Sequence, residues 1–332
     1  MKRLIIGCGQ TGSRLAEMFR GREDDIITFS TAIEDTFGLT NNVEIAKEGS
    51  GRNYNLGLKL WAENKEKLIE SLEPYSRRKV IYFASLAGGS GSSSIKFVLN
   101  TLLRQRNKVM FIGILPFLSE AIPATANAVR AMQRLNEYSD KISIMLFSNE
   151  YISKTFGRDY NSINNQILGS VRCVANLTAE LNDPDMYTPL AIDELESDSI
   201  AYSSGFLNVS FSNLEEENPK FIGYGKINEA RNILVIRSIY SKIKNDEVDK
   251  ESSRLVEIVK KISRRAKSAR ILYGIIRNNF DNLFYITIAT GFDITKLISK
   301  YKDYAIDRVT NYRQEREKID ILTKDEAKFL NV

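Results

Sequence analysis

Three short glycine-containing segments hold the residues of this sequence that are best suited to chemistry. They are Gly7–Gly12, Gly49–Asn53 and Ala87–Ser93, and each comes just before a stretch with helical spacing. Glycine lets the backbone turn tightly, so that its N–H groups at a helix N-terminus can surround a phosphate. The third segment adds serine hydroxyls, but it lacks the lysine of the Walker pattern, which excludes a P-loop NTPase. Together the segments predict a phosphate site along one rim of a sheet.

The first segment also has the G-x-G-x-x-G spacing of a dinucleotide-binding turn. That motif requires an acidic residue at the end of the following strand. Here the strand ends in Phe29-Ser30-Thr31, and the nearest acids, Asp24 and Asp25, precede it. A nicotinamide-dependent oxidoreductase is therefore a weaker alternative, and a turn that merely needs glycine is another.

The composition excludes several classes of enzyme. The chain has 332 residues, no histidine, two cysteines and a formal net charge of +5. A Ser-His-Asp triad, a histidine-ligated metal and a disulfide framework are all excluded. No apolar run approaches the ~20 residues that cross a bilayer, and Leu4–Ile6 is too short for a signal peptide. We expect a reducing, cytoplasmic compartment without membrane attachment.

These segments need a parallel sheet to position them, and the first half of the chain has that pattern. Short apolar runs alternate with amphipathic helices, which indicates an α/β fold of Rossmann type with helices on both faces. The predicted strands are 4–6, 26–29, 80–83, 109–115 and 142–147, and the predicted helices are 13–20, 56–72, 95–103 and 124–135. A long helix over 160–182 then ends at a strong stop signal, Asn182-Asp183-Pro184.

The second half predicts a smaller α+β domain. Helices are expected over 193–202, 229–243 and 251–266, and strands over 206–211, 271–276 and 284–289. The last two strands are expected to form a hairpin around Asn278-Asn279, and a terminal helix over 294–317 closes the chain. The predicted domain boundaries are 1–158, 159–183 (the central helix), 184–292 and 293–332.

Several motifs, in order along the chain, resemble the tubulin/FtsZ superfamily of filament-forming GTPases. Ala87–Ser93 resembles its GGGTG[ST]G signature, although Ala87, Ser90 and Ser93 replace a glycine, the threonine and a glycine. Ser148-Asn149-Glu150 resembles the segment whose asparagine contacts guanine. Tyr160–Asn165 resembles the start of the central helix, and Ile288–Phe292 a late strand of FtsZ.

The resemblance implies GTP or GDP as ligand, with Mg²⁺ held mainly by the nucleotide and water and no protein metal site. Tyr160 offers a stacking face, and Asn149 and Asn164 can donate and accept hydrogen bonds at the guanine edge. Glu120 falls where FtsZ has a glutamate near the ribose. The predicted nucleotide-binding residues are Gly7, Gly9, Gln10, Thr11, Gly12, Gly51, Arg52, Asn53, Ala87, Gly88, Gly89, Ser90, Gly91, Ser92, Glu120, Asn149, Tyr160 and Asn164.

The family completes its active site with acids from the neighbouring subunit, in the loop that follows the central helix. The resemblance assigns this catalytic role first to Asp193 and second to Glu196, with Asp198 as a further candidate. The alternative is that these acids only stabilise a helix N-terminus.

The long terminal helix resembles TubZ and PhuZ, the plasmid and phage relatives, which implies a head-to-tail filament that moves DNA in a bacterial or phage-infected host. FtsZ-like cell division and a non-hydrolysing nucleotide-dependent adaptor are alternatives. Arg254–Arg270 is rich in basic residues, as is the end of the terminal helix, so each could meet an acidic partner or a DNA-bound adaptor. A solvated helix face is the simpler explanation. No motif supports direct sequence-specific DNA binding.

Overall fold

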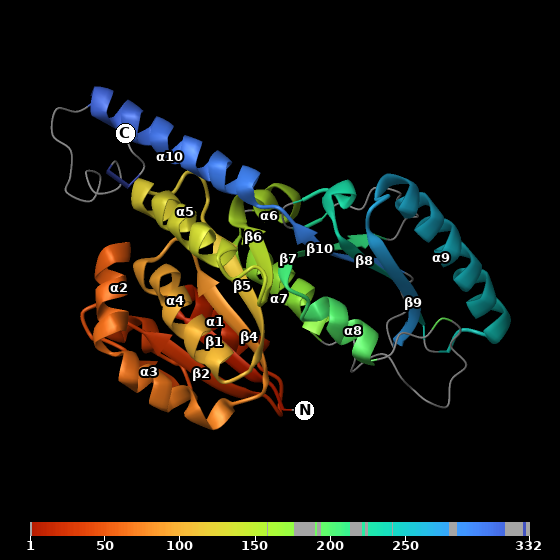
Figure 1. Ribbon diagram of the computed structural model, residues 1–332, viewed down its shortest axis with the longest axis horizontal. Helices are drawn as coiled ribbons and strands as arrows, with labels where there is room; N and C mark the ends of the chain where they lie inside the picture. The colour runs from red at the N-terminus through yellow and green to blue at the C-terminus, as the bar shows by residue number, and fades with distance from the viewer. Residues whose placement is uncertain are drawn as a thin grey trace. The chain divides into compact units, whose positions relative to one another are not determined.

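A computed structural model describes residues 2–157, 159–175, 190, 194–212, 221–222, 225–240, 242–278, 284–315 and 328–329. The chain divides into two compact units (Figure 1). Unit 1 comprises Met1–Asn164 and Ile294–Val332, and unit 2 comprises Asn165–Asp293.

Unit 1 is built on a parallel sheet, as the alternating pattern predicts. Its strands lie in the order β3-β2-β1-β4-β5-β6, and every pairing among them is parallel. Large apolar side chains of these strands, such as Phe29, Tyr82 and Phe111, are fully buried. The strands are β1 Leu4–Cys8, β2 Asp25–Ser30, β3 Asn42–Glu44, β4 Lys79–Ser85, β5 Lys108–Leu115 and β6 Ser143–Ser148.

The helices of unit 1 begin closer to the strands than the sequence predicts. Helix α1 starts at Gly9 and α4 at Gly89, so the glycine segments form first helical turns rather than free loops. The helix predicted over 56–72 is two helices, which meet at Asn64. The bounds are α1 Gly9–Phe19, η1 Ile33–Thr36, α2 Tyr54–Glu63, α3 Lys65–Leu72, η2 Glu73–Tyr75, α4 Gly89–Arg104, α5 Ile122–Asn136, α6 Asn149–Phe156 and α10 Thr295–Glu315. Helix α7, Tyr160–Ala175, begins in unit 1.

Helix α10 returns from the end of the chain to pack on α5 (Figure 1). Its buried side chains recur every four residues at Leu297, Tyr301, Ala305 and Val309, which is the spacing of one helical face. The Arg308 guanidinium donates a hydrogen bond to the carbonyl of Leu118 at 3.2 Å and another to the carbonyl of Glu120. This arginine of the predicted basic end therefore holds the helix against its own unit.

Unit 2 carries a mixed sheet in the order β7-β10-β8-β9. The prediction of a helix over 229–243 is wrong, because strand β8 occupies most of that range. Four consecutive apolar residues, Ile233–Ile236, are completely buried between two neighbouring strands, and β-branched residues favour that environment. The predicted hairpin is also wrong, because β9 and β10 both pair with β8. The elements are α8 Glu194–Ala201, β7 Gly205–Ser212, η3 Ile227–Glu229, β8 Asn232–Tyr240, α9 Asn245–Arg265, β9 Arg270–Asn278 and β10 Phe284–Phe292.

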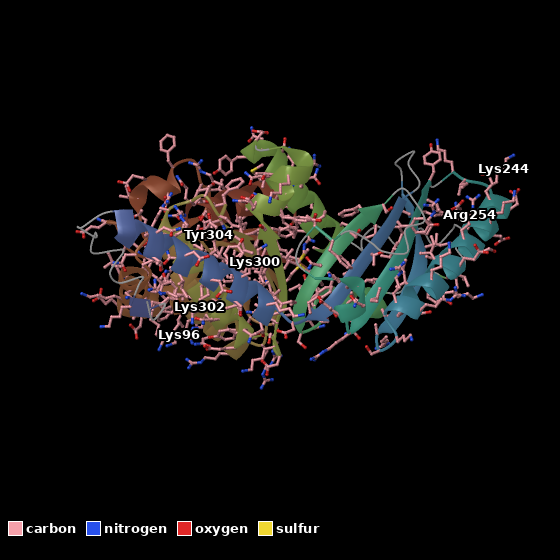
Figure 2. All side chains as sticks on the ribbon, turned by 90° about the horizontal axis from the view of Figure 1, so that it is seen from above. Lys96, Lys244, Arg254, Lys300, Lys302 and Tyr304 are labelled. Carbon is pink, nitrogen blue, oxygen red and sulfur yellow. The ribbon has the colours of Figure 1, made fainter. Side chains whose placement is uncertain are left out.

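A buried ion group joins α9 to the sheet of unit 2. The Glu251 carboxylate accepts from Arg237 Nε at 2.7 Å and from Arg254 at 2.5 Å. The Glu251 and Arg237 side chains are each only 6% exposed, so their charges depend on one another. The Arg254 side chain is itself 55% exposed on α9, and Lys244 immediately precedes this helix (Figure 2). Over the residues that are described, no helix has both the length and the apolar character that spanning a membrane requires.

Candidate functional site

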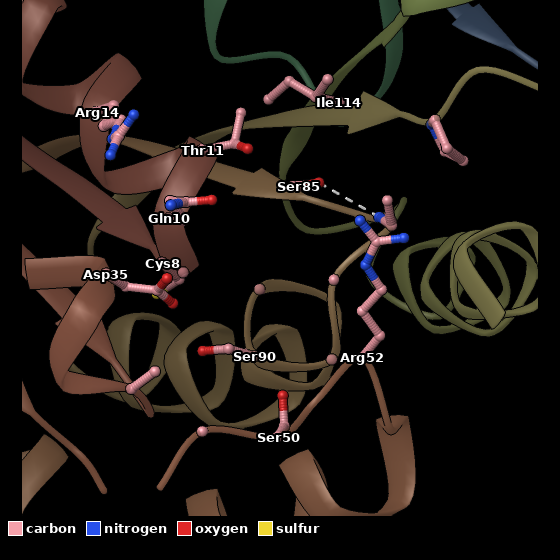
Figure 3. A pocket seen from close by; sticks show the side chains of 18 of the residues that line it. Cys8, Gln10, Thr11, Arg14, Asp35, Ser50, Arg52, Ser85, Ser90 and Ile114 are labelled. Carbon is pink, nitrogen blue, oxygen red and sulfur yellow. Dashed lines mark hydrogen bonds between the residues drawn. The ribbon is translucent and has the colours of Figure 1, made fainter. Parts of the chain in front are cut away.

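A cavity of about 700 Å³ opens in unit 1 where five parallel strands end. Its wall includes Cys8, Thr31, Ser85, Ile114 and Asn149, which lie at or just beyond the carboxyl ends of β1, β2, β4, β5 and β6. This edge of an open parallel sheet is where α/β proteins bind ligands. The volume is in the range of small-molecule sites. Figure 3 shows the side chains around the cavity.

Two helix N-termini face this cavity. Helices α1 and α4 follow β1 and β4 directly, and their N-cap residues are Cys8 and Gly88. Neither helix has a side-chain cap or an acidic residue in its first turn. The first N–H groups of a helix have no acceptor within the helix, and the helix dipole adds partial positive charge there. The two ends together favour an anion.

Close backbone contact lets the two helix N-termini converge. Gly9 has φ +67°, and a Cβ added to it would lie 3.1 Å from the backbone nitrogen of Gly91. A Cβ on Gly91 would lie 2.7 Å from the Ser85 carbonyl oxygen. Only glycine fits both positions without a shift of the backbone, which explains why the first and third glycine segments have glycine there.

The segment between β3 and α2 forms another wall. Gly51 and Arg52 both have positive φ, +53° and +65°, and both line the cavity. The chain then enters α2, where the Asn53 side chain accepts a hydrogen bond from the Leu56 N–H at 3.0 Å. A Cβ on Gly89 would lie 2.5 Å from Ser50 Oγ, so this segment packs directly on the start of α4.

The wall also contains two buried hydroxyl groups, Thr31 Oγ1 and Ser90 Oγ, that have no hydrogen-bond partner within the described chain. An unpaired buried hydroxyl is costly, so its presence in a cavity indicates a ligand that completes it. The Asp35 carboxyl also faces the cavity, and burial raises its pKa. Burial likewise raises the pKa of the Cys8 thiol to about 12, which keeps it neutral.

The far side of the cavity is suited to a flat, polar ring. Tyr160 is 60% exposed, and its ring contacts Phe117 edge-on with 6.0 Å between the centroids. Asn164 follows one helical turn later on the same face of α7, and both residues line the cavity with Asn149. Helix α10 supports this side, because the Tyr301 side chain hydrogen-bonds Ser148, although burial still raises the pKa of Tyr301 to about 12.

Most of the predicted nucleotide-binding residues line this one cavity: Gly9, Gln10, Thr11, Gly51, Arg52, Ala87, Gly88, Gly89, Ser90, Gly91, Glu120, Asn149, Tyr160 and Asn164. Their role in binding stays a prediction. The Glu120 carboxylate accepts from the Phe117 N–H at 3.0 Å, which fixes its own loop.

Four predicted residues do not line the cavity, for local reasons. Gly12 permits close helix–strand packing, since its Cβ would lie 2.5 Å from the Phe83 carbonyl oxygen, and Gly7 is similarly crowded by Ser13. Asn53 caps α2, and the buried Ser92 hydroxyl donates to the Gly88 carbonyl.

The predicted catalytic acids belong to unit 2. Asp193 lies outside the described residues. Glu196 lies in α8, although its side chain is outside the described part, and Asp198 follows on the same helix. Their catalytic role stays a prediction.

The cavity is also lined by residues that were not predicted to bind nucleotide. Some lie inside the motif segments described above: Cys8, Gly49, Ser50 and Asn161. The others lie outside those segments: Arg14, Thr31, Ala32, Asp35, Ser85, Ile114 and Pro116. Several of them simply follow the ends of parallel strands. Applying the strand-end rule to every predicted strand, rather than only to the glycine segments, would have found Thr31, Ser85 and Pro116.

Comparison with known proteins identifies this fold. Residues 23–157 match the family described as Tubulin/FtsZ family, GTPase domain. A search of curated proteins finds no match. Among solved structures, a GTPγS-form protofilament of TubZ from Bacillus thuringiensis serovar israelensis is 14% identical, with a TM-score of 0.73 over 96% of this chain and 93% of that one.

Two further structures are similar. A GTPγS-bound protofilament of CetZ2 from Haloferax volcanii is 18% identical, with a TM-score of 0.72 over 93% of this chain and 100% of that one. An empty FtsZ dimer from M. jannaschii is 16% identical, with a TM-score of 0.64 over 89% of each chain. At these identities the likeness establishes the fold, which is the tubulin/FtsZ fold that the sequence motifs predict.

Proposed function

We propose that the chain binds GTP in the cavity of unit 1 and hydrolyses it as it assembles head-to-tail into filaments, because residues 23–157 match the GTPase domain of the tubulin/FtsZ family. The observation that carries the proposal is the cavity itself. Two uncapped helix N-termini and two unpaired hydroxyls lie on its wall, and an exposed tyrosine with two asparagines lies on the other side.

The two sides of the cavity suit the two ends of a guanine nucleotide. The first-turn amides of α1 and α4, with the Ser90 hydroxyl, would bind the phosphates. Tyr160 would stack on the guanine ring, while Asn149 and Asn164 would bind its edge. Glu120 would lie near the ribose, as the family resemblance implies.

Mg²⁺ fits this site as a companion of the nucleotide. No group of three or more acids or cysteines that could hold a metal occurs in the described part of the chain. Mg²⁺ commonly keeps several waters and binds phosphate oxygens with few protein ligands. The phosphates would therefore hold the ion, which would neutralise their charge during hydrolysis.

We further propose that the neighbouring subunit completes the site. Two relatives of this fold are described as protofilaments and one as a dimer, which supports self-association. A head-to-tail contact is heterologous and propagates into a filament instead of closing. Asp193, with Glu196 second, would reach the nucleotide of the adjacent subunit and position water for attack.

A TubZ-like filament that segregates or positions plasmid or phage DNA is the biological role that we propose, because TubZ is among the similar structures and the long helix α10 follows strand β10. FtsZ-like cell division is the second candidate, supported by the FtsZ match. The exposed basic residues of α9, which include Lys260 and Arg264, are the proposed docking face for an acidic adaptor.

Light scattering and phosphate release, measured together, test this function. Scattering should rise after addition of GTP and Mg²⁺ but not of GDP, and electron microscopy should show filaments. Asp193→Ala should keep assembly and slow phosphate release, because it removes only the predicted water-positioning acid. The filament proposal fails if GTP produces no scattering at any protein concentration. Unchanged turnover in Asp193→Ala would assign catalysis to another acid.

A further inference from the structure

We propose that Asn127 is a positioning residue for the nucleotide, one that fixes the peptide between Ala87 and Gly88 in its phosphate-binding orientation. The inference rests on the proposed function. Asn127 lies on α5, is completely buried and does not line the cavity. Its side-chain Nδ2 donates to the Arg52 carbonyl at 2.8 Å and to the Ala87 carbonyl at 3.1 Å. One amide thus joins two walls of the cavity that are far apart in sequence.

The bond to Ala87 determines where the next N–H points. A trans peptide is planar, so its C=O and N–H groups point in opposite directions. With the Ala87 carbonyl turned toward Asn127, the N–H of Gly88 points to the other side of the peptide. Gly88 lines the cavity and is the N-cap of α4. Its N–H therefore adds to the donors at the start of that helix.

Gly88 itself would tolerate the opposite orientation of this peptide. Gly88 has φ −82°, and rotating the peptide by half a turn would carry it to positive φ, which glycine accepts readily. No atom lies within 4 Å of where a Cβ of Gly88 would be. The rotated peptide would present a carbonyl oxygen in place of an N–H, which would repel a phosphate. The Asn127 bond is the contact that favours the productive orientation.

A contact with Arg130 gives the side-chain amide of Asn127 a defined orientation. Arg130 donates to Asn127 Oδ1 at 3.4 Å, so the oxygen faces the guanidinium and the nitrogen faces the carbonyls. The Arg130 guanidinium lies over the Phe329 ring, 4.1 Å from its centroid.

The other carbonyl that accepts from Asn127 belongs to Arg52, whose left-handed backbone is unfavourable for a residue with a side chain. The bond from Asn127 helps to hold that conformation.

Asn127→Asp tests the proposal, because aspartate has nearly the same shape but places an acceptor opposite both carbonyls. Affinities for GTP, GDP and guanosine are measured on the purified full chain by competition with a fluorescent GTP analogue. We expect GTP and GDP to bind about 10- to 100-fold more weakly, the equivalent of losing one or two hydrogen bonds to buried groups. Guanosine, which has no phosphate, should change by less than about threefold on the same argument.

Asn107→Asp is the matched control. Asn107 is also buried, its Oδ1 accepts from the Arg78 N–H at 2.7 Å, and it precedes β5 at the end of the sheet that is remote from the cavity. It should leave all three affinities unchanged. Asn127→Ala is the second variant, in case the aspartate prevents folding. It removes the donor without adding a repelling acceptor, so it should show the same preference for guanosine with a smaller loss.

The outcomes separate this inference from the proposed function. If the unmodified chain binds GTP and both Asn127 variants bind it equally well, the positioning role is overturned while the GTPase proposal stands. Equal losses for guanosine and GTP would also overturn it, because they would indicate general damage to the cavity. If the unmodified chain binds no guanine nucleotide, the proposed function itself fails.

Discussion

Replacing Ser90 by alanine should make the protein more stable and its nucleotide site worse. Ser90 is the second residue of α4 and only 7% exposed, and its hydroxyl has no partner in the described structure. Its backbone carbonyl accepts from Trp61 Nε1 at 3.1 Å, a contact that the substitution leaves intact. The hydroxyl has therefore been removed from water without a protein hydrogen bond to replace it.

The expected sizes follow from that difference. Burying an unpaired hydroxyl costs about 1–3 kcal/mol, so Ser90→Ala should raise the free energy of unfolding of the nucleotide-free protein by about 1 kcal/mol. With nucleotide bound, the hydroxyl would donate to a charged phosphate, and such a bond contributes about 1.5–3 kcal/mol. Affinity for GTP should therefore fall about 10- to 150-fold.

Ser94→Ala supplies the comparison, because that serine is also buried on the same helix but its hydroxyl is hydrogen-bonded. Its hydroxyl donates to the Gly91 carbonyl at 2.6 Å and lies 2.5 Å from the Tyr82 hydroxyl oxygen. Removing it should cost about 1–2 kcal/mol of stability. Urea denaturation and calorimetric titration with GTP measure both quantities. The reasoning is refuted if Ser90→Ala is as destabilising as Ser94→Ala and binds GTP normally.

Three other substitutions or reactions test particular contacts. Glu251→Gln leaves the buried Arg237 without its counter-charge, so unfolding in urea should show a loss of about 3–5 kcal/mol; a loss below about 1 kcal/mol would contradict this account. The hydrogen bond from Lys2 holds the pKa of Asp25 below its usual value, so the stabilisation exists above pH 3.8 and disappears as pH falls through the lowered pKa. Asp25→Asn should therefore lower the melting temperature slightly at pH 7 and not in strong acid, and an equal difference at both pH values would refute the assignment. Burial raises the pKa of the Cys8 thiol to about 12, so iodoacetamide at pH 8 should alkylate this cysteine only after denaturation. Mass spectrometry detects the alkylation, and rapid alkylation of Cys8 in the native protein would contradict its burial.

The sequence predicts the parallel sheet and the glycine-lined cavity because both depend on local pattern. The apolar runs of β1, β4 and β5 are short and bounded by glycine or polar residues, which favours buried strands. The sequence pattern places the starts of α1 and α4 too late along the chain, because glycine and serine are poor helix formers. Position after a buried strand outweighs that propensity, so Gly9 and Gly89 begin helices.

The errors arise where tertiary pairing decides the outcome. The segment Ile233–Ile236 is apolar on every side, which a buried helix and a central strand share, and only its pairing with two strands resolves the ambiguity. Asn127 has no signal of its own, because an asparagine within a helix is ordinary. Its importance depends on the packing of α5 against two segments that lie 75 and 40 residues away along the chain.

Calorimetric titration of the purified chain with GTP, ATP and NAD⁺ in the presence of Mg²⁺ tests the central claim most directly. The cavity of unit 1 should bind one GTP per chain, and bind it at least about tenfold more tightly than ATP or NAD⁺, because Asn149 and Asn164 suit the guanine edge. Preferential binding of NAD⁺ would instead support a dinucleotide site at the first glycine segment. That result, or no binding of GTP, would contradict the account.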